Sequence, residues 1–149
     1  MIKTVTSGLI ASILFLLLSA GAQAQQAAAP AAAQPRYRVV MQVSNPDPRG
    51  WHQALANAMA LRKNAGPANV RIEIVVIGAG IGMLRYDSPQ AAEVAAVLEQ
   101  GVKVLACGET MKSLILEPDE MLPGIGHVPA GLIEIMDRQR EGWFYIKAD

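Results

Sequence analysis

The sequence predicts an α/β fold in which helices cover both faces of a mostly parallel sheet. Segments rich in β-branched residues alternate with segments of helical periodicity from residue 36 onward. Such alternation is typical of units whose parallel strands are joined by helices. Residues 70–77 also end in a continuous apolar run, as in a strand that is buried on both faces of a parallel sheet.

The first strand is predicted at residues 37–43, and the first helix follows it closely. Asp47 is a suitable N-cap, and Pro48 is favoured at the first helical position. An apolar stripe at helical spacing continues from there until Gly66 ends the helix. Its members are Trp51, Ala54, Leu55, Ala58, Met59 and Leu61.

The second strand, residues 70–77, leads into a glycine-rich segment at residues 78–88. Its first glycines match a dinucleotide fingerprint, but Met83 stands where that fingerprint requires its last glycine. We therefore interpret the segment as a flexible loop with a close backbone approach. Ser88, which is followed by proline, predicts the start of a helix that runs to residue 100.

The third strand is predicted at residues 102–106, with Cys107 at its end. A short helix at residues 109–116 should follow, with a further helical turn at residues 117–122. The side chains expected on one side of the short helix are Met111, Leu114 and Ile115.

The chain should end with a very short strand at residues 124–129, a helix at residues 130–141 and a final strand at residues 143–146. The helix is expected to direct Leu132, Ile135 and Met136 inward. The order of the strands within the sheet does not follow from these patterns.

Residues 1–24 have the features of a cleavable secretory signal peptide. Lys3 supplies the positive start, residues 9–18 form the apolar region, and Ala24 ends a small-x-small cleavage pattern. The alternative is a membrane anchor, but a spanning helix needs about 20 apolar residues and this run is too short. We therefore expect export to the periplasm and no membrane attachment after cleavage.

The remaining chain divides into a linker and one domain. Residues 25–35 are a low-complexity Ala/Gln/Pro stretch that reads as a disordered linker, and residues 36–149 form the α/β domain. With 13 basic and 13 acidic residues, the whole chain has a formal net charge of zero. No basic run is present, which argues against a nucleic-acid partner.

Cys107 is the only cysteine of the chain and the main candidate for chemistry. It stands between a strand and a helix, where backbone N–H groups of the helical first turn favour the nucleophilic thiolate. The alternative is a cysteine that serves as a small apolar packing residue. The residue pattern leaves both readings open.

Function in parallel α/β sheets gathers at the carboxyl ends of the strands. The candidate site residues from the loops at these ends are Asn45, Gly78, Gly80, Gly108 and Thr110. No set of residues has the spacing of a metal site, and a Cys107–His127 catalytic pair would rest on composition alone. We expect neither a metal nor a cofactor.

Residues 36–147 resemble the DsrE/DsrF-like family of sulfur-relay proteins. The motifs that carry the resemblance are residues 101–107, Thr110 with Met111, residues 122–124, residues 128–131 and residues 139–147. The resemblance implies a three-layer α/β/α domain around a parallel sheet of about five strands. It also implies a homo-oligomer, because family members commonly form dimers, trimers or hexamers.

The same resemblance implies that Cys107 holds sulfur as a persulfide and exchanges it with a donor or acceptor protein. The well-understood relay members work in the cytoplasm, so an exported member would need other partners. Two alternatives remain: a non-catalytic oligomeric binding module in which Cys107 is a packing residue, and a redox sensor that joins two copies of Cys107 in a disulfide.

Overall fold

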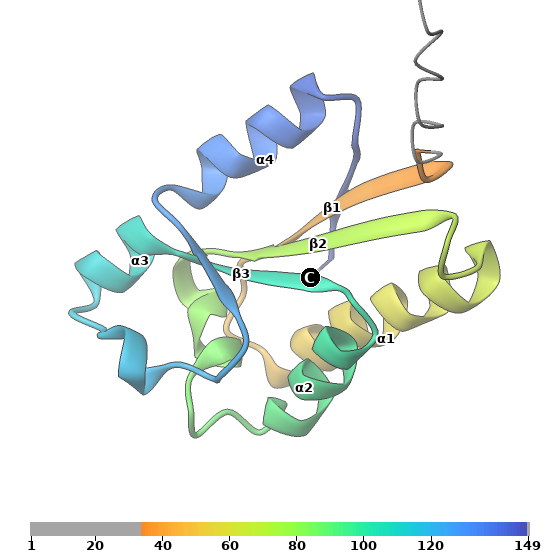
Figure 1. The fold of residues 1–149 in the computed structure, drawn as a ribbon. Coiled ribbons are helices and arrows are strands. Elements are labelled where there is room, and N and C mark those ends of the chain that lie inside the picture. The colour runs from red at the N-terminus through yellow and green to blue at the C-terminus, as the bar shows by residue number, and fades with distance from the viewer. Residues whose placement is uncertain (1–33, 149) are drawn as a thin grey trace, which may run out of the picture. The chain divides into compact units, whose positions relative to one another are not determined.

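The computed structural model describes residues 34–148, which contain a parallel five-stranded sheet with the strand order β4-β3-β2-β1-β5 (Figure 1). The predicted α/β class is therefore confirmed. The predicted signal peptide and nearly all of the predicted linker lie outside the described residues. The strands are β1 (Tyr37–Val43), β2 (Val70–Val76), β3 (Lys103–Cys107), β4 (Gly126–Val128) and β5 (Phe144–Lys147).

Helices lie on both faces of this sheet (Figure 1). Since β1, β2 and β3 follow one another across the sheet, right-handed crossovers place α1 and α2 on the same face. The connection from β4 to β5 runs back across the sheet, so α4 covers the opposite face. The helices are α1 (Pro48–Ala65), α2 (Ala91–Glu99), α3 (Gly108–Ser113) and α4 (Gly131–Arg140), with the 3₁₀ helices η1 (Gly78–Leu84) and η2 (Pro118–Glu120). Within residues 34–148, none of them is long and apolar enough to cross a membrane.

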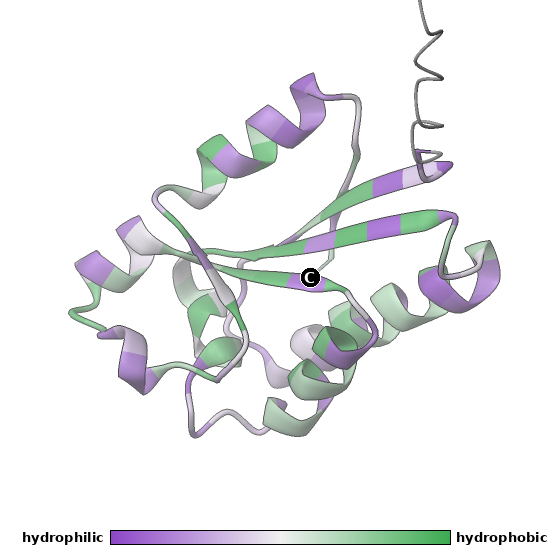
Figure 2. Ribbon diagram, viewed as in Figure 1, coloured by the Kyte–Doolittle hydropathy of each residue, from purple (hydrophilic) through white to green (hydrophobic). Residues whose placement is uncertain are grey.

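The two faces of the sheet contribute to hydrophobic cores of unequal size. The larger core includes residues of α1, α2 and η1 together with Met41, Ile72 and Ile74 of the sheet. The smaller core, on the α4 side, consists of Val40, Val75, Ile135 and Trp143. Figure 2 shows mostly hydrophobic residues along the middle strands and a hydrophilic C-terminal part of α4. The α4 face therefore relies more on polar contacts than the other face does.

The glycine-rich segment is a 3₁₀ helix at its start, so the prediction of a flexible loop was wrong there. Ile81, Met83 and Leu84 are buried in the larger core, and this burial holds the segment in place. The predicted close approach is confirmed at Gly80, because a Cβ atom there would lie 2.8 Å from the carbonyl oxygen of Val43.

Helix α2 begins at Ala91, later than the proline signal predicted. The Ser88 hydroxyl accepts a hydrogen bond from the Gln90 backbone N–H at 3.2 Å, so it stabilises the turn that precedes the helix. Helix α3 ends at Ser113, so Leu114 and Ile115 are exposed and do not share one side of the helix with the buried Met111, as the sequence predicted. A positive φ of 54° at Ile115 marks where the chain leaves the helix.

Helix α4 presents a different face to the sheet than its apolar residues predicted. Ile135 is buried as expected, but Leu132 and Met136 are exposed. Gly131 and Arg138 share the inner side with Ile135, at the spacing of one helical face. The cause lies on β2, where the fully buried carboxylate of Glu73 requires a cation and draws Arg138 toward the sheet.

Candidate functional site

Cys107 is the last residue of β3 and the N-cap of α3. Side chains alternate along a strand, and Leu105 packs against the smaller core, so Cys107 points to the same face of the sheet, which α4 covers. Its residue exposure is 5%. The thiol is thus nearly enclosed at the carboxyl edge of the sheet, where the first residues of α4 pass over it.

Hydrogen-bond donors surround the sulfur atom of Cys107. The backbone N–H of Gly131 donates to Sγ at 3.2 Å. The Thr110 hydroxyl and the N–H groups of Thr110 and Glu109 act on it from the first turn of α3. Burial by itself would raise the pKa of the Cys107 thiol, but these donors together outweigh it and hold the pKa below its usual value. Uncharged groups therefore favour the thiolate here.

Glycines allow the two helix starts to approach each other. A Cβ atom on Gly131 would lie 3.1 Å from the Cβ of Cys107 and 2.5 Å from Cγ2 of Ile77. A Cβ atom on Gly108 would lie 3.1 Å from the carbonyl oxygen of Pro129. Any larger residue at either position would push the start of α4 away from the sulfur.

Three of the predicted site residues gather around Cys107. Gly108 follows it directly, and Thr110 is one turn further along α3. The backbone N–H of Gly78, at the start of η1, donates to Oγ1 of Thr110 at 3.0 Å. The start of the glycine-rich segment is therefore hydrogen-bonded to α3, the helix that follows Cys107.

The other two predicted site residues have local structural contacts. Oδ1 of Asn45 accepts a hydrogen bond from the backbone N–H of Asp47 at 3.0 Å, and its carbonyl accepts one from Nε1 of Trp51 at 2.8 Å. Asn45 thereby stabilises the turn before α1. Gly80 lies against the end of β1, as described above.

Neither histidine supports the Cys–His alternative. His127 of β4 is exposed and lies opposite Ala106 in the strand pairing, while Val128 lies opposite Cys107. His52 of α1 pairs with Glu93 of α2 at 2.8 Å on the surface. Among residues 34–148, no group of three His, Cys, Asp or Glu side chains could hold a metal ion.

The sequence reasoning missed Gly131, whose N–H donates to the sulfur. A signal was available, since residues 128–131 precede a helix and the first N–H groups of any helix lack partners within that helix. The sequence pattern does not show that the start of this helix lies over the end of β3, because Gly131 and Cys107 are 24 residues apart in the chain.

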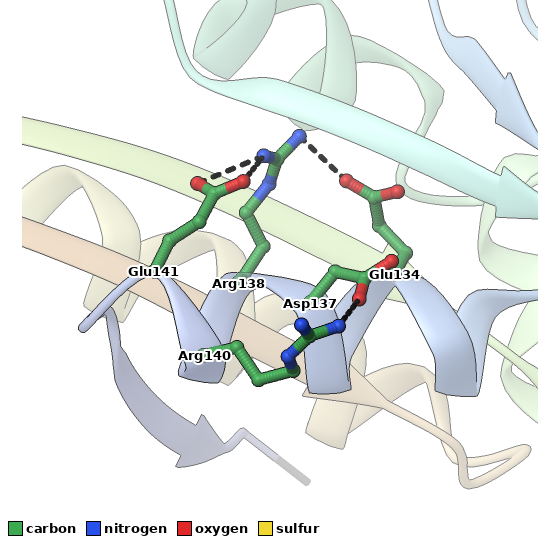
Figure 3. Close-up of a pocket in the computed structure, with 5 residues that line it drawn as sticks. All are labelled: Glu134, Asp137, Arg138, Arg140 and Glu141. Carbon is green, nitrogen blue, oxygen red and sulfur yellow. Dashed lines mark hydrogen bonds and ion pairs between the residues drawn. The ribbon is translucent and has the colours of Figure 1, made fainter.

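A second polar cluster lies on the C-terminal half of α4, beside a hollow of about 410 Å³ (Figure 3). Nε of Arg138 is 2.9 Å from Oε1 of the buried Glu73. The same guanidinium pairs with Glu134 at 2.6 Å and with Glu141 at 3.1 Å, and it stacks on the Trp143 ring. This cluster ties α4 to the sheet, and its acidic groups share one arginine.

The DsrE/DsrF-like family model matches residues 37–148 of the chain. A solved structure of a protein of unknown function from Methanobacterium thermoautotrophicum is 33% identical, with a TM-score of 0.71, and the match covers 74% of this chain and 98% of that one. No curated protein matches the chain.

Two further solved structures are similar to this chain in fold alone. A conserved protein of unknown function from Bacteroides thetaiotaomicron is 16% identical with a TM-score of 0.60, and the match covers 74% of this chain and 93% of that one. The ychN protein from E. coli is 15% identical with a TM-score of 0.58, and the match covers 76% of this chain and 98% of that one.

Proposed function

The chain belongs to the DsrE/DsrF-like family, and from this membership we propose that Cys107 carries sulfur as a persulfide in a sulfur relay. The observation that supports the proposal best is the set of donors around the sulfur, which lowers the pKa of the thiol despite its burial. Sulfur exchange needs the thiolate, because the thiolate is the nucleophile.

The chemistry requires no cofactor. The Cys107 thiolate attacks the outer sulfur of a donor persulfide, and a new S–S bond forms as the S–S bond of the donor breaks. The donor leaves as a thiolate, and Cys107 holds the transferred sulfur as a persulfide. Attack by an acceptor thiolate on that outer sulfur reverses the process. No net oxidation occurs, since one S–S bond replaces another at each step.

The proposal includes the location and the assembly of the protein. The pattern of residues 1–24 favours export and cleavage, so the donor and acceptor would be periplasmic proteins or small persulfides. Exposed apolar side chains on α4 favour a homo-oligomer, namely Leu132, Ile133 and Met136. Sequencing the N-terminus of the protein from a periplasmic fraction tests the export step, and a chain that still begins at Met1 would contradict it.

The near-complete burial of Cys107 favours a second candidate function. A thiol that is 5% exposed suits a packing residue of a non-catalytic binding module, whose ligand or partner would be bound by the loops at the same edge. In that case, the folded protein would keep Cys107 unreactive. The reactivity of the thiol therefore separates the two candidates.

The deciding experiment follows alkylation of Cys107 against pH and then measures intact mass after exposure to polysulfide. Because Cys107 is the only cysteine, all of the signal comes from one site. We expect a thiolate that forms below the free-cysteine pKa of about 8.5 and a gain of one sulfur atom. Cys107→Ser is the control that should gain none. A thiol that reacts only after unfolding, with no added sulfur, would favour the binding module.

A further inference from the structure

The start of α4 covers the sulfur of Cys107. The residue is 5% exposed, and the backbone N–H of Gly131 donates to Sγ at 3.2 Å. A Cβ atom on Gly131 would lie only 3.1 Å from the Cβ of Cys107, so the helix start is in direct contact with the cysteine. A reagent as large as a persulfide therefore needs this part of α4 to move before it can reach the sulfur.

Few contacts hold the first turn of α4 in this position. Of the residues in this helix, Gly131 and Ile135 are the buried ones, and Gly131 has no side chain to pack. Leu132 and Ile133 are more than half exposed, and the N-cap residue, Ala130, makes no side-chain hydrogen bond. A segment with few buried apolar contacts opens locally at a lower free-energy cost than the whole domain.

A charged anchor of α4 lies further along the same face of the helix. Arg138 follows Gly131 by seven residues, or about two turns, so both lie on the inner side. Nε of Arg138 is 2.9 Å from Oε1 of Glu73, whose side chain is 1% exposed on the central strand β2. The guanidinium also lies over the Trp143 ring, 5.2 Å from its centroid. Since one continuous helix joins the two positions, the anchor at Arg138 sets where Gly131 lies.

We propose that Arg138 is a positioning residue for Cys107, and that its ion pair with Glu73 holds the start of α4 over the sulfur as a cover. With the pair intact, the thiol is shielded. With α4 displaced, the sulfur is open to a persulfide donor or acceptor. This inference rests on the proposed function, because a cover has a use only if Cys107 reacts, but the shielding itself is measurable with a reagent that carries no sulfur.

The test follows the rate of alkylation of Cys107 by iodoacetamide in the folded protein against pH. The midpoint of this profile reports the pKa of the thiol, and its alkaline plateau reports access to the sulfur. We expect the plateau of Arg138→Met to exceed that of wild type at least about tenfold, because loss of the ion pair frees the helix. Arg138→Lys keeps a cation beside Glu73 without the guanidinium fork and should lie between the two.

Urea separates local opening of α4 from unfolding of the whole domain. A reaction that needs only local opening depends weakly on urea, whereas one that needs global unfolding depends on it steeply. We expect the weak dependence in wild type and in Arg138→Met below the unfolding transition, and Arg138→Lys takes the place of the methionine variant if that variant does not fold. Arg140→Met is the matched control on the same helix and should leave the plateau unchanged, because the side chain of Arg140 is 82% exposed and pairs with Asp137 on the surface.

The outcomes separate this inference from the proposed function. A wild-type plateau equal to that of free cysteine overturns the inference, as does a plateau that is unchanged in both Arg138 variants, even if wild type takes up sulfur. An increase that follows global unfolding in urea, or an equal increase in Arg140→Met, overturns it as well. A raised plateau with weak urea dependence supports the cover, even if polysulfide adds no sulfur and the relay is wrong.

Discussion

At the scale of single residues, two opposed effects act on the thiol of Cys107. Burial disfavours the charged thiolate, whereas the hydrogen bonds from Thr110, Gly131 and Glu109 favour it. The donors win because several of them converge on one sulfur atom, and hydrogen bonds to a charged group are about twice as strong as those between neutral groups. A nearly enclosed cysteine can therefore still be a nucleophile.

A second buried group at this scale is the carboxylate of Glu73. Its Oε1 pairs with Arg138, but among the described residues its Oε2 has no hydrogen-bond partner. Burial, and then the neighbouring Glu73 carboxylate, raise the pKa of Glu134, while the charge of Arg138 acts in the opposite sense. The lowering effect of Arg138 on the pKa of Glu134 is the smaller one, because Arg138 also pairs with Glu73 and Glu141. A protonated Glu134 can donate to the Glu73 carboxylate.

The first prediction concerns Glu134→Gln and the pH dependence of stability. In wild type, the folded pKa of Glu134 lies above its unfolded value of about 4.3. The resulting stability is present below the unfolded pKa and is lost as the pH rises through the folded pKa. The glutamine amide does not titrate and can donate to Glu73. The variant should thus match wild type in acid and be more stable by about 1 kcal/mol near pH 8.

Urea unfolding at an acidic and a mildly alkaline pH measures this difference in the free energy of unfolding. Glu99→Gln, on the exposed surface of α2, is the control and should change little at either pH. A difference between Glu134→Gln and wild type that is the same at both pH values would contradict the prediction.

At the scale of elements, the ion pair between Glu73 of β2 and Arg138 of α4 determines how α4 docks. The side chain of Glu73 is 1% exposed and that of Arg138 is 24% exposed. Among the described residues, the apolar core on this face has four buried members, with Ile77 and Leu105 packed against them, so the polar contact contributes much to the orientation of the helix. The orientation of α4 matters for the site, because Gly131 at its start contacts the sulfur.

The second prediction is that Arg138→Met costs about 3 kcal/mol of unfolding free energy, because it leaves the Glu73 charge buried without its cation. Replacing both partners with methionine should recover most of this loss, since a buried ion pair is often no more stabilising than apolar packing. Urea denaturation of the two single variants and the double variant measures the coupling.

The ion pair between Asp137 and Arg140 on the surface is the control for these variants of Glu73 and Arg138. The side chain of Arg140 is 82% exposed, so Arg140→Met should change stability by at most about 0.5 kcal/mol. If the losses of the two methionine variants at Glu73 and Arg138 simply add, the pair does not act as a unit and the prediction is wrong.

At the scale of the whole molecule, exposed apolar side chains are concentrated on α4 and β5. Leu132, Ile133 and Met136 of α4 are each more than half exposed, as is Phe144 of β5. All four side chains are large and apolar, and monomeric proteins rarely expose a large contiguous apolar patch. They favour an interface between copies of the chain on the face that also carries the start of α4.

The third prediction is that the protein is a homo-oligomer in reductant, and that Met136→Glu shifts it toward the monomer. A buried carboxylate at an apolar interface would lack a partner and oppose association. Light scattering after size-exclusion chromatography measures the mass. Lys63→Glu, exposed on α1 and thus on the opposite face of the sheet, should leave the mass unchanged. A monomeric wild type would contradict the prediction, and the reductant excludes a Cys107–Cys107 disulfide as the cause.

The sequence by itself determined the features that depend on near neighbours. The bounds of β1 were predicted correctly, and α1 begins at Pro48, where Oδ1 of Asp47 accepts a hydrogen bond from the N–H of Arg49. Strand propensity and helix capping depend on only a few neighbouring residues, so they are readable without knowledge of the tertiary structure. The place of Cys107 at the end of β3 followed from the same kind of local pattern.

Only the tertiary structure decided what joins distant segments. The donor Gly131 lies 24 residues from Cys107, and Gly78 lies 32 residues from Thr110. The burial of Glu73 was missed for the same reason, because its alternating strand pattern resembles that of a solvent-facing charge until Arg138 is placed over it. Local propensity specifies which elements form, but the strand order and the packing of α4 arise from contacts that no short stretch of the chain contains.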